Sequence, residues 1–368
     1  MAKRLLCIIS SLNTGGAETF LMKVYRGLDK SEYQMDFAVS AEGYYDQEVL
    51  ALGGRIYRIP LRTEHPVKVF RELKRIVKQN KYDSVLKLGN APLCVIDLIA
   101  AKLGGAKICA MRSCNALTNL SFKQRLTDFV FRPILNKVAN VKIAPSDLAA
   151  LYTFGEKNYQ NGKVCILHNG VDLNLFRFDE KERARIREEL SLTDKMVVGH
   201  IGRFSKQKNH KFLLPVFAQI KRKNDQAKLL LVGTGELENE IRALAEELAI
   251  TDDIIFAGVR ADIPALLSAM DVFLLTSLYE GMPNTVIEAQ ATGLPCVVSD
   301  TITRQADITG LVHYVSLNEA HTVWADEAVK LYINGRKDTA ESFLKEKYDI
   351  DSVRSLFVQL LYNSKQYK

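Results

Sequence analysis

Two cations in the second half of the chain have the types and the spacing needed to hold an anionic group. Arg203 and Lys208 lie five residues apart in a loop that follows the apolar run 196–201 and leads into a helical pattern. An arginine can bind a diphosphate through two parallel hydrogen bonds, and a lysine supplies a mobile point charge beside it. The alternative is a basic loop that is simply exposed to water, and the spacing alone favours neither interpretation.

Two glutamates further along the chain flank a second strand-to-helix turn. Glu280 and Glu288 have seven residues between them, and the apolar run 272–276 precedes the first. Glu288, near a helix start, could accept two hydrogen bonds from a ribose diol, while Glu280 could face a sugar ring. Without a ligand, the two glutamates would only stabilise the helix start, by about 0.3–1 kcal/mol each.

The helix that begins after this turn could also hold a phosphate. The N–H groups of a first helical turn have no partner inside the helix and lie at the positive end of its dipole. Here they are the N–H groups of Asn284, Thr285 and Val286. A glycine-rich turn at Gly15 and Gly16 could serve the same purpose, although a tight turn also needs glycine when no ligand is bound. That turn lacks the G-x-G-x-x-G spacing of nicotinamide-binding proteins.

All these turns stand at the ends of apolar strands that alternate with amphipathic helices, which predicts βα units and parallel sheets. In the first half we predict strands at 5–10, 35–39, 55–59, 84–88, 107–111, 142–144 and 164–167, and helices at 17–28, 67–79, 94–103, 122–138 and 147–154. After a seam that includes 168–172 and the charged segment 179–189, we predict strands at 196–201, 228–232, 254–257, 272–276 and 295–299, and helices at 209–223, 236–248, 263–269 and 284–292. We therefore expect an α/β protein with two Rossmann-like, doubly wound domains, 1–172 and 173–350, and a ligand cleft at the carboxyl ends of their strands.

Length and composition agree with two globular domains. The chain has 368 residues, of which 47% are apolar and 25% charged, and a single core rarely grows beyond about 250–300 residues. No run approaches the ~20 apolar residues of a membrane span, and the first strand leaves no room for a signal peptide before it. The six cysteines form no C-x-x-C pair, and the six histidines show no metal-binding spacing. We expect a cytoplasmic protein with reduced thiols and no metal site.

Positive charge gathers in the first half. Residues 1–172 contain 25 Lys and Arg against 15 Asp and Glu, whereas residues 173–368 contain 25 against 28. The basic half suits an anionic partner, which could be nucleic acid, an anionic membrane or a pyrophosphate-linked substrate. The segments 67–79 and 122–138 could form basic amphipathic helices on a membrane, although any helix packed on a sheet has a similar pattern. The second is the stronger candidate, because its aromatic residues fall on more than one face.

Together these motifs resemble the retaining glycosyltransferases of family 4, which have the GT-B fold, and among them the bacterial capsular and exopolysaccharide enzymes. The similarity runs from about Leu5 to Asp300 and is most specific in the second half. The segments that match the family are 15–18, 169–172, 202–204 with 208–209, 231–235, 256–259 and 280–288. The likeness to the capsular and exopolysaccharide enzymes comes from segments such as 272–278 and 293–300. The resemblance also implies that a last helix, within about 351–368, packs back on the first domain.

The resemblance implies roles for the charged residues. Arg203 and Lys208 would neutralise the diphosphate of a nucleotide-sugar as the glycosidic bond breaks, and Gly16 would donate its N–H to the same phosphates across the cleft. Glu288 would hold the ribose and Glu280 the hydroxyls of the donor sugar. Losing one donor that stabilises growing negative charge typically costs about 3–4 kcal/mol of activation free energy.

The remaining donor site is also implied by the family. Gly258 and Val259 would support the base, usually uracil. No divalent metal and no cofactor besides the nucleotide-sugar is expected, because side chains supply the positive charge. The other donor-binding residues would be Gly202, Gly281, Met282, Pro283, Asn284, Thr285 and Val286.

One position departs from the family pattern. Many members have a histidine close to the reacting sugar, after the strand that corresponds to 107–111, and this chain has none there. Arg112 or Asn115 could provide a hydrogen bond on the acceptor side instead, or neither could contact the substrate.

We therefore expect a retaining, metal-independent hexosyltransferase. It would transfer a hexose or N-acetylhexosamine from a UDP-sugar to a glycan, carried on a polyprenyl pyrophosphate, in capsular, exopolysaccharide or O-antigen synthesis. It would work in the cytoplasm or on the inner face of the plasma membrane, in contact with anionic lipid and without nucleic acid. Two alternatives stay open: an epimerase of the same architecture, and a nucleotide-sugar-binding protein without turnover, which the absent histidine favours.

Overall fold

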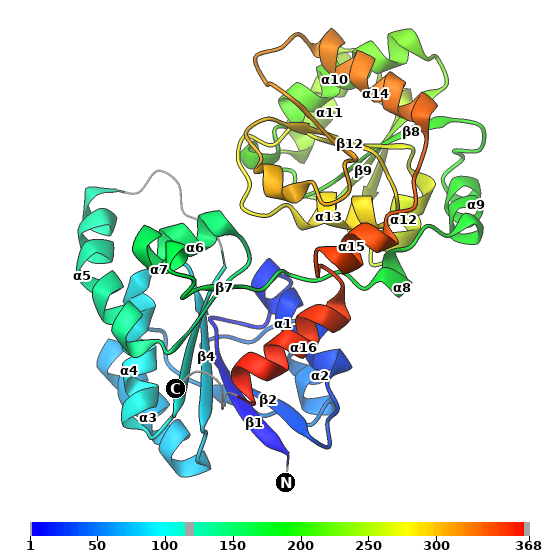
Figure 1. Ribbon diagram of the computed structural model, residues 1–368. Helices are drawn as coiled ribbons and strands as arrows, with labels where there is room; N and C mark the ends of the chain where they lie inside the picture. Colours follow the sequence, from blue (N-terminus) through cyan, green and yellow to red (C-terminus); the bar gives the residue numbers. More distant parts are fainter. Residues whose placement is uncertain (1, 115–120, 364–368) are drawn as a thin grey trace. The chain divides into compact units, whose positions relative to one another are not determined.

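The computed structural model describes residues 2–114 and 121–363, which divide into two compact units (Figure 1). Unit 1 comprises Met1–Gly170 and Ile350–Lys368, and unit 2 comprises Val171–Asp349. The chain thus crosses between the units twice, first inside the predicted seam at 168–172 and again just before the last helix.

Unit 1 is built on a seven-stranded sheet in which every described pairing is parallel. The strand order is β3-β2-β1-β4-β5-β6-β7. Its strands are β1 (Lys3–Ile8), β2 (Tyr33–Val39), β3 (Ile56–Arg58), β4 (Ser84–Gly89), β5 (Ile108–Ser113), β6 (Val141–Ala144) and β7 (Cys165–Ile166).

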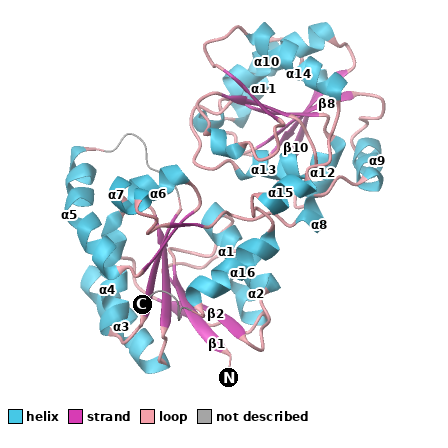
Figure 2. Ribbon diagram, in the orientation of Figure 1, coloured by secondary structure: helices cyan, strands magenta, loops and turns pink. Residues whose placement is uncertain are grey.

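Helices cover both faces of this sheet (Figure 2), so the central strands are apolar on both sides. From β1, Leu5 and Cys7 pack on α1 (Gly16–Gly27), α2 (Asp46–Ala51) and α16 (Ile350–Leu361), whereas Leu6 and Ile8 pack on the opposite helices. Those opposite helices are α3 (Pro66–Asn80), α4 (Val95–Leu103), α5 (Phe122–Val138) and α6 (Asp147–Phe154), with the short α7 (Glu156–Gln160) beside them.

The helix α16 belongs to unit 1 although unit 2 precedes it in the sequence. Val353 and Phe357 are buried in the same cluster as Phe20 of α1, and the rings of Phe20 and Phe357 meet edge to face at 6.1 Å. The last helix therefore completes one face of the first sheet.

Unit 2 repeats the architecture with six strands in the order β10-β9-β8-β11-β12-β13, again with parallel pairings. The strands are β8 (Met196–Ile201), β9 (Ala227–Val232), β10 (Ile254–Gly258), β11 (Val272–Leu275), β12 (Cys296–Ser299) and β13 (Val312–Val315). One face carries α8 (Leu173–Phe176), α9 (Glu180–Glu189), α12 (Ile263–Ala269), α13 (Asn284–Ala291) and α15 (Ala340–Lys345). The other carries α10 (His210–Lys223), α11 (Glu238–Glu247) and α14 (His321–Asn334).

Two parts of unit 2 differ from the sequence-based expectation. The charged segment 179–189 does not belong to the seam; it forms α9, of which Ile186 is the buried residue. Its apolar side is too narrow to be recognised from periodicity. The edge strand β13 was not predicted. Helix was expected around Trp324 without stated bounds, and α14 adds this buried side chain to the core.

Strand order reverses at one point in each sheet. In unit 1 the chain moves outward from β1 to β2 and β3 and then returns to β4, on the other side of β1; in unit 2 the same reversal separates β8 from β11. In open α/β sheets, ligands bind outside the carboxyl ends of the strands at this point. The loops that follow β8 and β11 are therefore the first place to look for a site in unit 2. Within the described part of the chain, no helix is both long enough and apolar enough to cross a bilayer.

Candidate active site

Lys208 and Glu280, which lie 72 residues apart in the sequence, meet where the strand order of unit 2 reverses. Lys208 Nζ is 2.7 Å from Glu280 Oε1, and Ser277 Oγ donates to the same oxygen at 2.7 Å. The side chains of Lys208 and Glu280 are 16% and 10% exposed. Because the pair is largely removed from water, its charges act more strongly on a neighbouring ligand than exposed charges would.

Backbone contacts lock the two loops together. The N–H of Leu278 donates to the carbonyl of Gln207 at 2.8 Å. The hydroxyl of Thr276 donates to the carbonyls of Lys208 and Asn209, at 3.3 and 3.2 Å. Asn209 has a left-handed backbone, with φ of 57°, which turns the chain into α10. The position of Lys208 is thus fixed by the end of β11 as well as by its own loop.

Arg203 lies in the same loop but points to another partner. Its Nε donates to Glu236 Oε2 at 3.1 Å, and its side chain is 74% exposed. An exposed ion pair of this kind contributes little to stability, so an anionic ligand can replace Glu236 at small cost. The structure brings Lys208 to Glu280 and leaves Arg203 on the surface.

Three glycines allow the loops at this end of the sheet to approach closely. Gly233 has φ of 132°, and a Cβ there would lie 2.2 Å from the carbonyl oxygen of Gly202. The N–H of Gly233 donates to the carbonyl of Gly258 at 2.8 Å. Beyond Gly258 the chain turns outward, and Val259 is 80% exposed. Val259 is thus accessible, as a platform for a base requires.

The turn from Gly281 to Pro283 leads directly into α13. Met282 is partly buried against the core of unit 2, and Pro283 occupies the position before the helix. Glu288 lies one turn into α13, as expected. Of the other predicted donor residues, Asn284 and Thr285 open α13.

The prediction for Val286 needs correction. Its N–H donates to the carbonyl of Pro283 at 3.0 Å, and its side chain is fully buried. The tight first turn of α13 uses this N–H internally, so Val286 is a core residue and does not offer a donor to phosphate.

Two buried histidines lie beside Lys208. His200 Nδ1 donates to the carbonyl of Leu274, 2.9 Å away. The rings of His200 and His210 meet edge to face, with their centres 4.7 Å apart. His200 and Lys208 both lie close to Gly202, because a Cβ added to this glycine would be 3.1 Å from His200 Nε2 and from Lys208 Cε. Burial, and then the charge of Lys208, lowers the pKa of His210 to about 4. Both histidines are therefore neutral near pH 7. His200 lies within the predicted strand 196–201, and nothing in the sequence pairs it with His210.

On the acceptor side of the prediction, the structure corrects Arg112. Its side chain is 1% exposed, its guanidinium stacks 3.8 Å from the ring centre of Phe20, and it donates to Asn169 Oδ1 at 2.7 Å. Burial lowers the pKa of Arg112 to about 10. Arg112 thus holds the end of unit 1 together rather than facing a substrate. Asn115 lies outside the described residues.

The glycine turn of unit 1 contains one carboxylate that the sequence analysis did not assign. Gly16 is the first residue of α1, and Gly15 precedes the helix. The carboxyl group of Glu18 folds back onto Gly15 and occupies the space beside it, because a Cβ added to Gly15 would be 2.3 Å from Glu18 Oε2. Burial raises the pKa of Glu18. Its signal in the sequence is its place in the first turn after β1, at the reversal point of unit 1.

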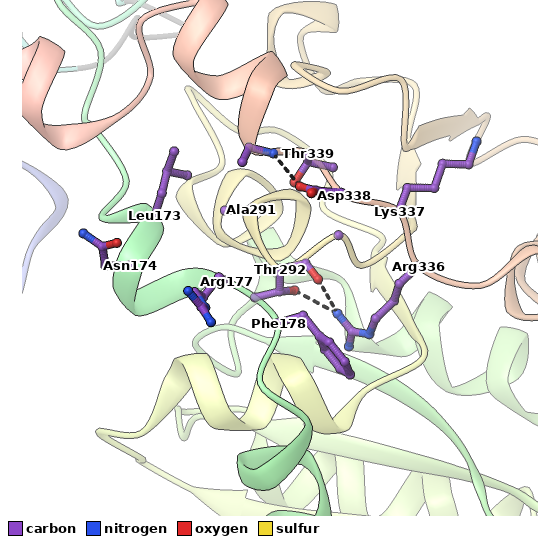
Figure 3. A pocket seen from close by; sticks show the side chains of 12 residues that line it. Leu173, Asn174, Arg177, Phe178, Ala291, Thr292, Arg336, Lys337, Asp338 and Thr339 are labelled. Atoms are coloured by element: carbon purple, nitrogen blue, oxygen red, sulfur yellow. Dashed lines mark hydrogen bonds between the residues drawn. The ribbon is translucent and has the colours of Figure 1, made fainter.

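A pocket of about 550 Å³ lies in another part of unit 2 (Figure 3). It is lined by α8, by the C-terminal end of α13, and by the loop that begins at Arg336. The guanidinium of Arg336 is committed to protein carbonyls, among them those of Thr292 at 2.7 Å and Leu267 at 2.5 Å. Because the cation beside this pocket already has its partners, the pocket is a weaker anion site than the loops around Lys208.

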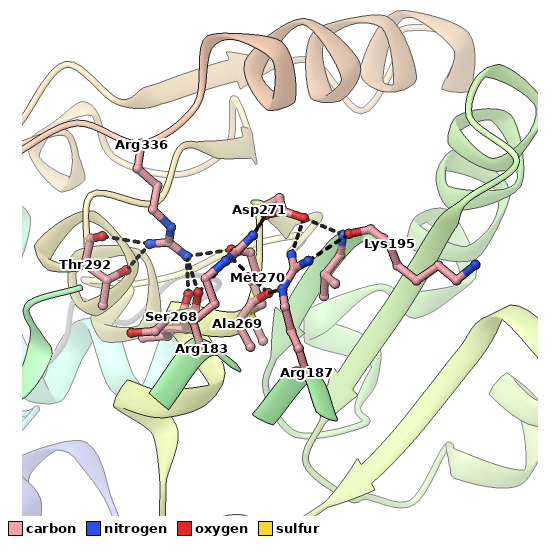
Figure 4. Close-up of polar contacts among 11 residues, drawn as sticks. Arg183, Arg187, Lys195, Ser268, Ala269, Met270, Asp271, Thr292 and Arg336 are labelled. Carbon is pink, nitrogen blue, oxygen red and sulfur yellow. Dashed lines mark hydrogen bonds and ion pairs between the residues drawn. The ribbon is translucent and has the colours of Figure 1, made fainter. Parts of the chain in front are cut away.

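Arg336 belongs to a cluster of three arginines at the C-terminal end of α12 (Figure 4). Arg183 and Arg187 each reach Asp271 at 2.6 Å. Arg183 also donates to the carbonyls of Ser268, Ala269 and Met270, and Arg187 to the carbonyl of Ala269. Burial lowers the pKa of Arg336 to about 9. These cations satisfy the carbonyls that a helix end leaves without partners. No group of three or more His, Cys, Asp or Glu among residues 2–114 and 121–363 could hold a metal ion.

Known families match both units. Residues 14–175 match the family described as Glycosyltransferase Family 4, and residues 182–315 match Glycosyl transferases group 1. Over 355 residues the chain is 35% identical to the glycosyltransferase EpsF of Bacillus subtilis, which covers 94% of this chain and 91% of EpsF. The chain belongs to this glycosyltransferase family. The resemblance seen in its motifs is thereby confirmed.

Other relatives of this glycosyltransferase carry more specific names. It is 29% identical over 245 residues to the UDP-Gal:alpha-D-GlcNAc-diphosphoundecaprenol alpha-1,3-galactosyltransferase of Escherichia coli, covering 64% of this chain and 62% of that one. It is 24% identical over 316 residues to an N-acetylgalactosaminyltransferase of Campylobacter jejuni whose name specifies a diphospho-undecaprenol-linked acceptor, covering 80% and 83%.

Solved structures confirm the predicted GT-B fold of the glycosyltransferase. HepE of Anabaena, crystallised with UDP, superimposes with a TM-score of 0.78 at 19% identity, covering 97% of this chain and 98% of HepE. WaaG, a glycosyltransferase involved in lipopolysaccharide biosynthesis, superimposes with a TM-score of 0.66 at 13% identity, covering 99% of this chain and 96% of WaaG.

Proposed function

We propose that this glycosyltransferase transfers a hexose or N-acetylhexosamine from a UDP-sugar to a lipid-linked glycan, with retention of anomeric configuration and without a metal ion. The observation that carries the proposal is the largely buried contact between Lys208 and Glu280 at the reversal point of unit 2. The structure of HepE with UDP and the names of two relatives that act on diphosphoundecaprenol-linked sugars support the choice of donor and acceptor. Assembly of a capsular, exopolysaccharide or O-antigen glycan is the process we infer.

The chemical demand is the departure of UDP. As the bond between the sugar and the β-phosphate breaks, negative charge grows on the diphosphate, and fixed positive charge stabilises it. Lys208 is held in place by Glu280 and by Thr276, so little reorganisation is needed when that charge appears. Arg203 leaves Glu236 and adds a bidentate contact.

The other donor contacts follow from the same loops. Glu280 accepts hydrogen bonds from the sugar hydroxyls with the oxygen that does not contact Lys208, and Glu288 holds the ribose. Gly258 and Val259 support the base. The first N–H groups of α13, those of Asn284 and Thr285, face the phosphates.

A binding assay and a transfer assay test the proposal separately. A ligand present at a hundred times its dissociation constant adds about 2.7 kcal/mol to the stability of the folded state. We expect UDP-sugars to raise the melting temperature and other nucleotide-sugars to raise it less. Glu280→Gln is expected to abolish transfer of the sugar that gives the largest shift, and Glu247→Gln, an exposed change on α11, is expected to leave transfer unchanged.

Two outcomes would contradict the proposal. Unaltered transfer by Glu280→Gln would remove the assigned role of this residue. A UDP-sugar that binds tightly but is never transferred to any glycan would indicate a binding protein without turnover.

A further inference from the structure

The helix α5 in unit 1 turns large apolar side chains toward water. Phe122 is 83% exposed, Phe129 77%, Leu126 55% and Val130 49%. Their spacing places them on one side of the helix. We call these four residues the α5 face. Isolated exposed apolar residues are ordinary, but a contiguous group on one helix face is typical of an interaction surface.

A neighbouring helix shows what the usual arrangement is. α3 has an apolar stripe of the same spacing, but its members Val69, Leu73, Ile76 and Val77 are at most 4% exposed, because they pack on the sheet. α5 reaches the body of unit 1 through its opposite side, where Leu135 is buried. The α5 face is therefore additional to the side that anchors the helix.

The inner side of α5 also takes up its only acidic residue. Asp128 is 4% exposed and accepts a hydrogen bond from the hydroxyl of Tyr152 at 3.0 Å. Arg132, on the same side, donates to the carbonyl of Tyr152 at 3.0 Å. Asp128 and Arg132 are thus engaged within unit 1, and they do not offset the charges outside.

The charges that remain outside are positive. Lys123, Arg125 and Lys137 are exposed, and none of the three forms an ion pair with another described residue. The helix start is also firmly built, because Ser121 and Gln124 form a capping box. The structure thus presents a stable helix with an apolar face flanked by free cations.

We propose that the α5 face inserts into the interface of an anionic membrane. Phenylalanine and leucine partition into the boundary between headgroups and acyl chains, and lysine and arginine beside them bind anionic headgroups. A second copy of this chain is a poorer occupant, because a twofold contact through the α5 face would bring Lys123 and Arg125 close to their own counterparts. The inference goes beyond the proposed transfer reaction, since it does not depend on turnover.

Co-sedimentation with lipid vesicles tests the inference. The full chain is expected to pellet with vesicles of equal parts phosphatidylglycerol and phosphatidylcholine, and far less with phosphatidylcholine alone. Phe122→Gln with Phe129→Gln is expected to abolish binding to both. Lys123→Glu with Arg125→Glu is expected to weaken binding to the anionic vesicles at least about 25-fold, since each basic residue near such a surface contributes about five-fold.

Two matched controls test whether loss of any exposed apolar side chain, or the same charge change elsewhere, weakens vesicle binding. Ile333→Gln removes an apolar side chain that is 76% exposed on α14, outside the face. Lys68→Glu with Lys74→Glu makes the same charge change on α3. Both controls are expected to bind like the unchanged protein, and all variants are expected to retain its melting temperature.

Three results would overturn the inference. The first is no preference of the unchanged protein for anionic vesicles, and the second is equal binding by the double phenylalanine variant. The third is a dimer in lipid-free solution that this variant converts to a monomer, which would assign the α5 face to self-association. Transfer to a water-soluble acceptor, measured on the same samples, keeps the outcome independent of the proposed function.

Discussion

Unit 2 contains two groups of cations that the sequence alone cannot rank. Around α12, the guanidinium groups of Arg183, Arg187 and Arg336 donate to carbonyls or to Asp271. At the carboxyl ends of β8 and β11, Lys208 contacts Glu280, and Arg203 is mostly in water. The N–H donors of the first group are bonded to the protein itself, whereas the second group still has N–H donors that a ligand can reach. An anion site is therefore recognised by the donors that the protein leaves available rather than by the number of positive residues.

The largest expected effect on stability comes from breaking the first group. Asp271→Ala leaves Arg183 and Arg187 partly buried without their carboxylate and removes the acceptor of the Val197 N–H. Loss of one partner from a buried ion pair costs about 3–5 kcal/mol. We expect urea unfolding to show a loss of that size, while turnover of the folded fraction at low temperature stays the same. A change below about 1 kcal/mol would mean that the carbonyls alone hold the arginines.

Breaking the second group is expected to reduce the activity of the folded protein as well as its stability. Lys208→Met keeps the length of the side chain but removes the charge that stabilises the departing diphosphate, which typically costs about 3–4 kcal/mol in activation free energy. We expect kcat of the folded protein to fall by two to three orders of magnitude, and the unfolding free energy to fall as well, because Glu280 is 10% exposed and loses its cation. An unchanged kcat in the folded fraction would place Lys208 in the structural group.

The third prediction concerns His210, a buried histidine beside Lys208, and the pH dependence of stability. The folded pKa of His210 is about 4, below its ordinary value of 6.5, so the unfolded chain binds more protons between these values. The stabilisation from neutral His210 is fully present above pH 6.5 and is lost as the pH falls toward 4. The slope is at most about 1.4 kcal/mol per pH unit for one group.

His210→Phe is expected to reduce this pH dependence of the unfolding free energy. His65→Gln, a change at an exposed histidine in unit 1, is expected to leave it unchanged. Urea titrations between pH 4 and 7 of all three proteins provide the comparison. Parallel curves for the unchanged protein and His210→Phe would show that this histidine does not titrate with unfolding.

The smallest effect is expected at the surface. Glu236→Ala removes the partner of Arg203, and both side chains are more than half exposed. Exposed pairs contribute about 0–1 kcal/mol, so the unfolding free energy is expected to change by less than that. Transfer is expected to be preserved or slightly faster, because Arg203 no longer has to leave a carboxylate. A large loss of stability would mean that Arg203 has a structural role.

Much of the fold could be predicted from local pattern. The helix 122–138 was predicted with its observed ends, because Ser121 and Gln124 mark its start and the apolar spacing continues to Val138. The strand β8 was predicted equally well, since every residue from Met196 to Ile201 is apolar or buried. The helix α9 was not, because its position depends on arginines that reach the carbonyls of α12, and such contacts leave no periodicity in the sequence.

The candidate site could be predicted only in parts. Lys208 and Glu280 were assigned from separate turns, and their contact depends on β8 and β11 being neighbours, which strand order decides. Arg112 could be named only as a candidate, because its partners, Phe20 and Asn169, come from distant segments. For Val286, the error arose because the first turn of α13 is tighter than a regular helix.

The return of α16 to unit 1 constrains the order in which the polypeptide can fold during synthesis. Unit 2 is one uninterrupted stretch, so the ribosome releases all of it before residue 350 appears. The first sheet, although translated earlier, keeps Phe20 and its neighbours uncovered until Phe357 emerges. The half of the protein that is made first therefore matures last, and its incomplete face is exposed to chaperones and to aggregation for most of translation.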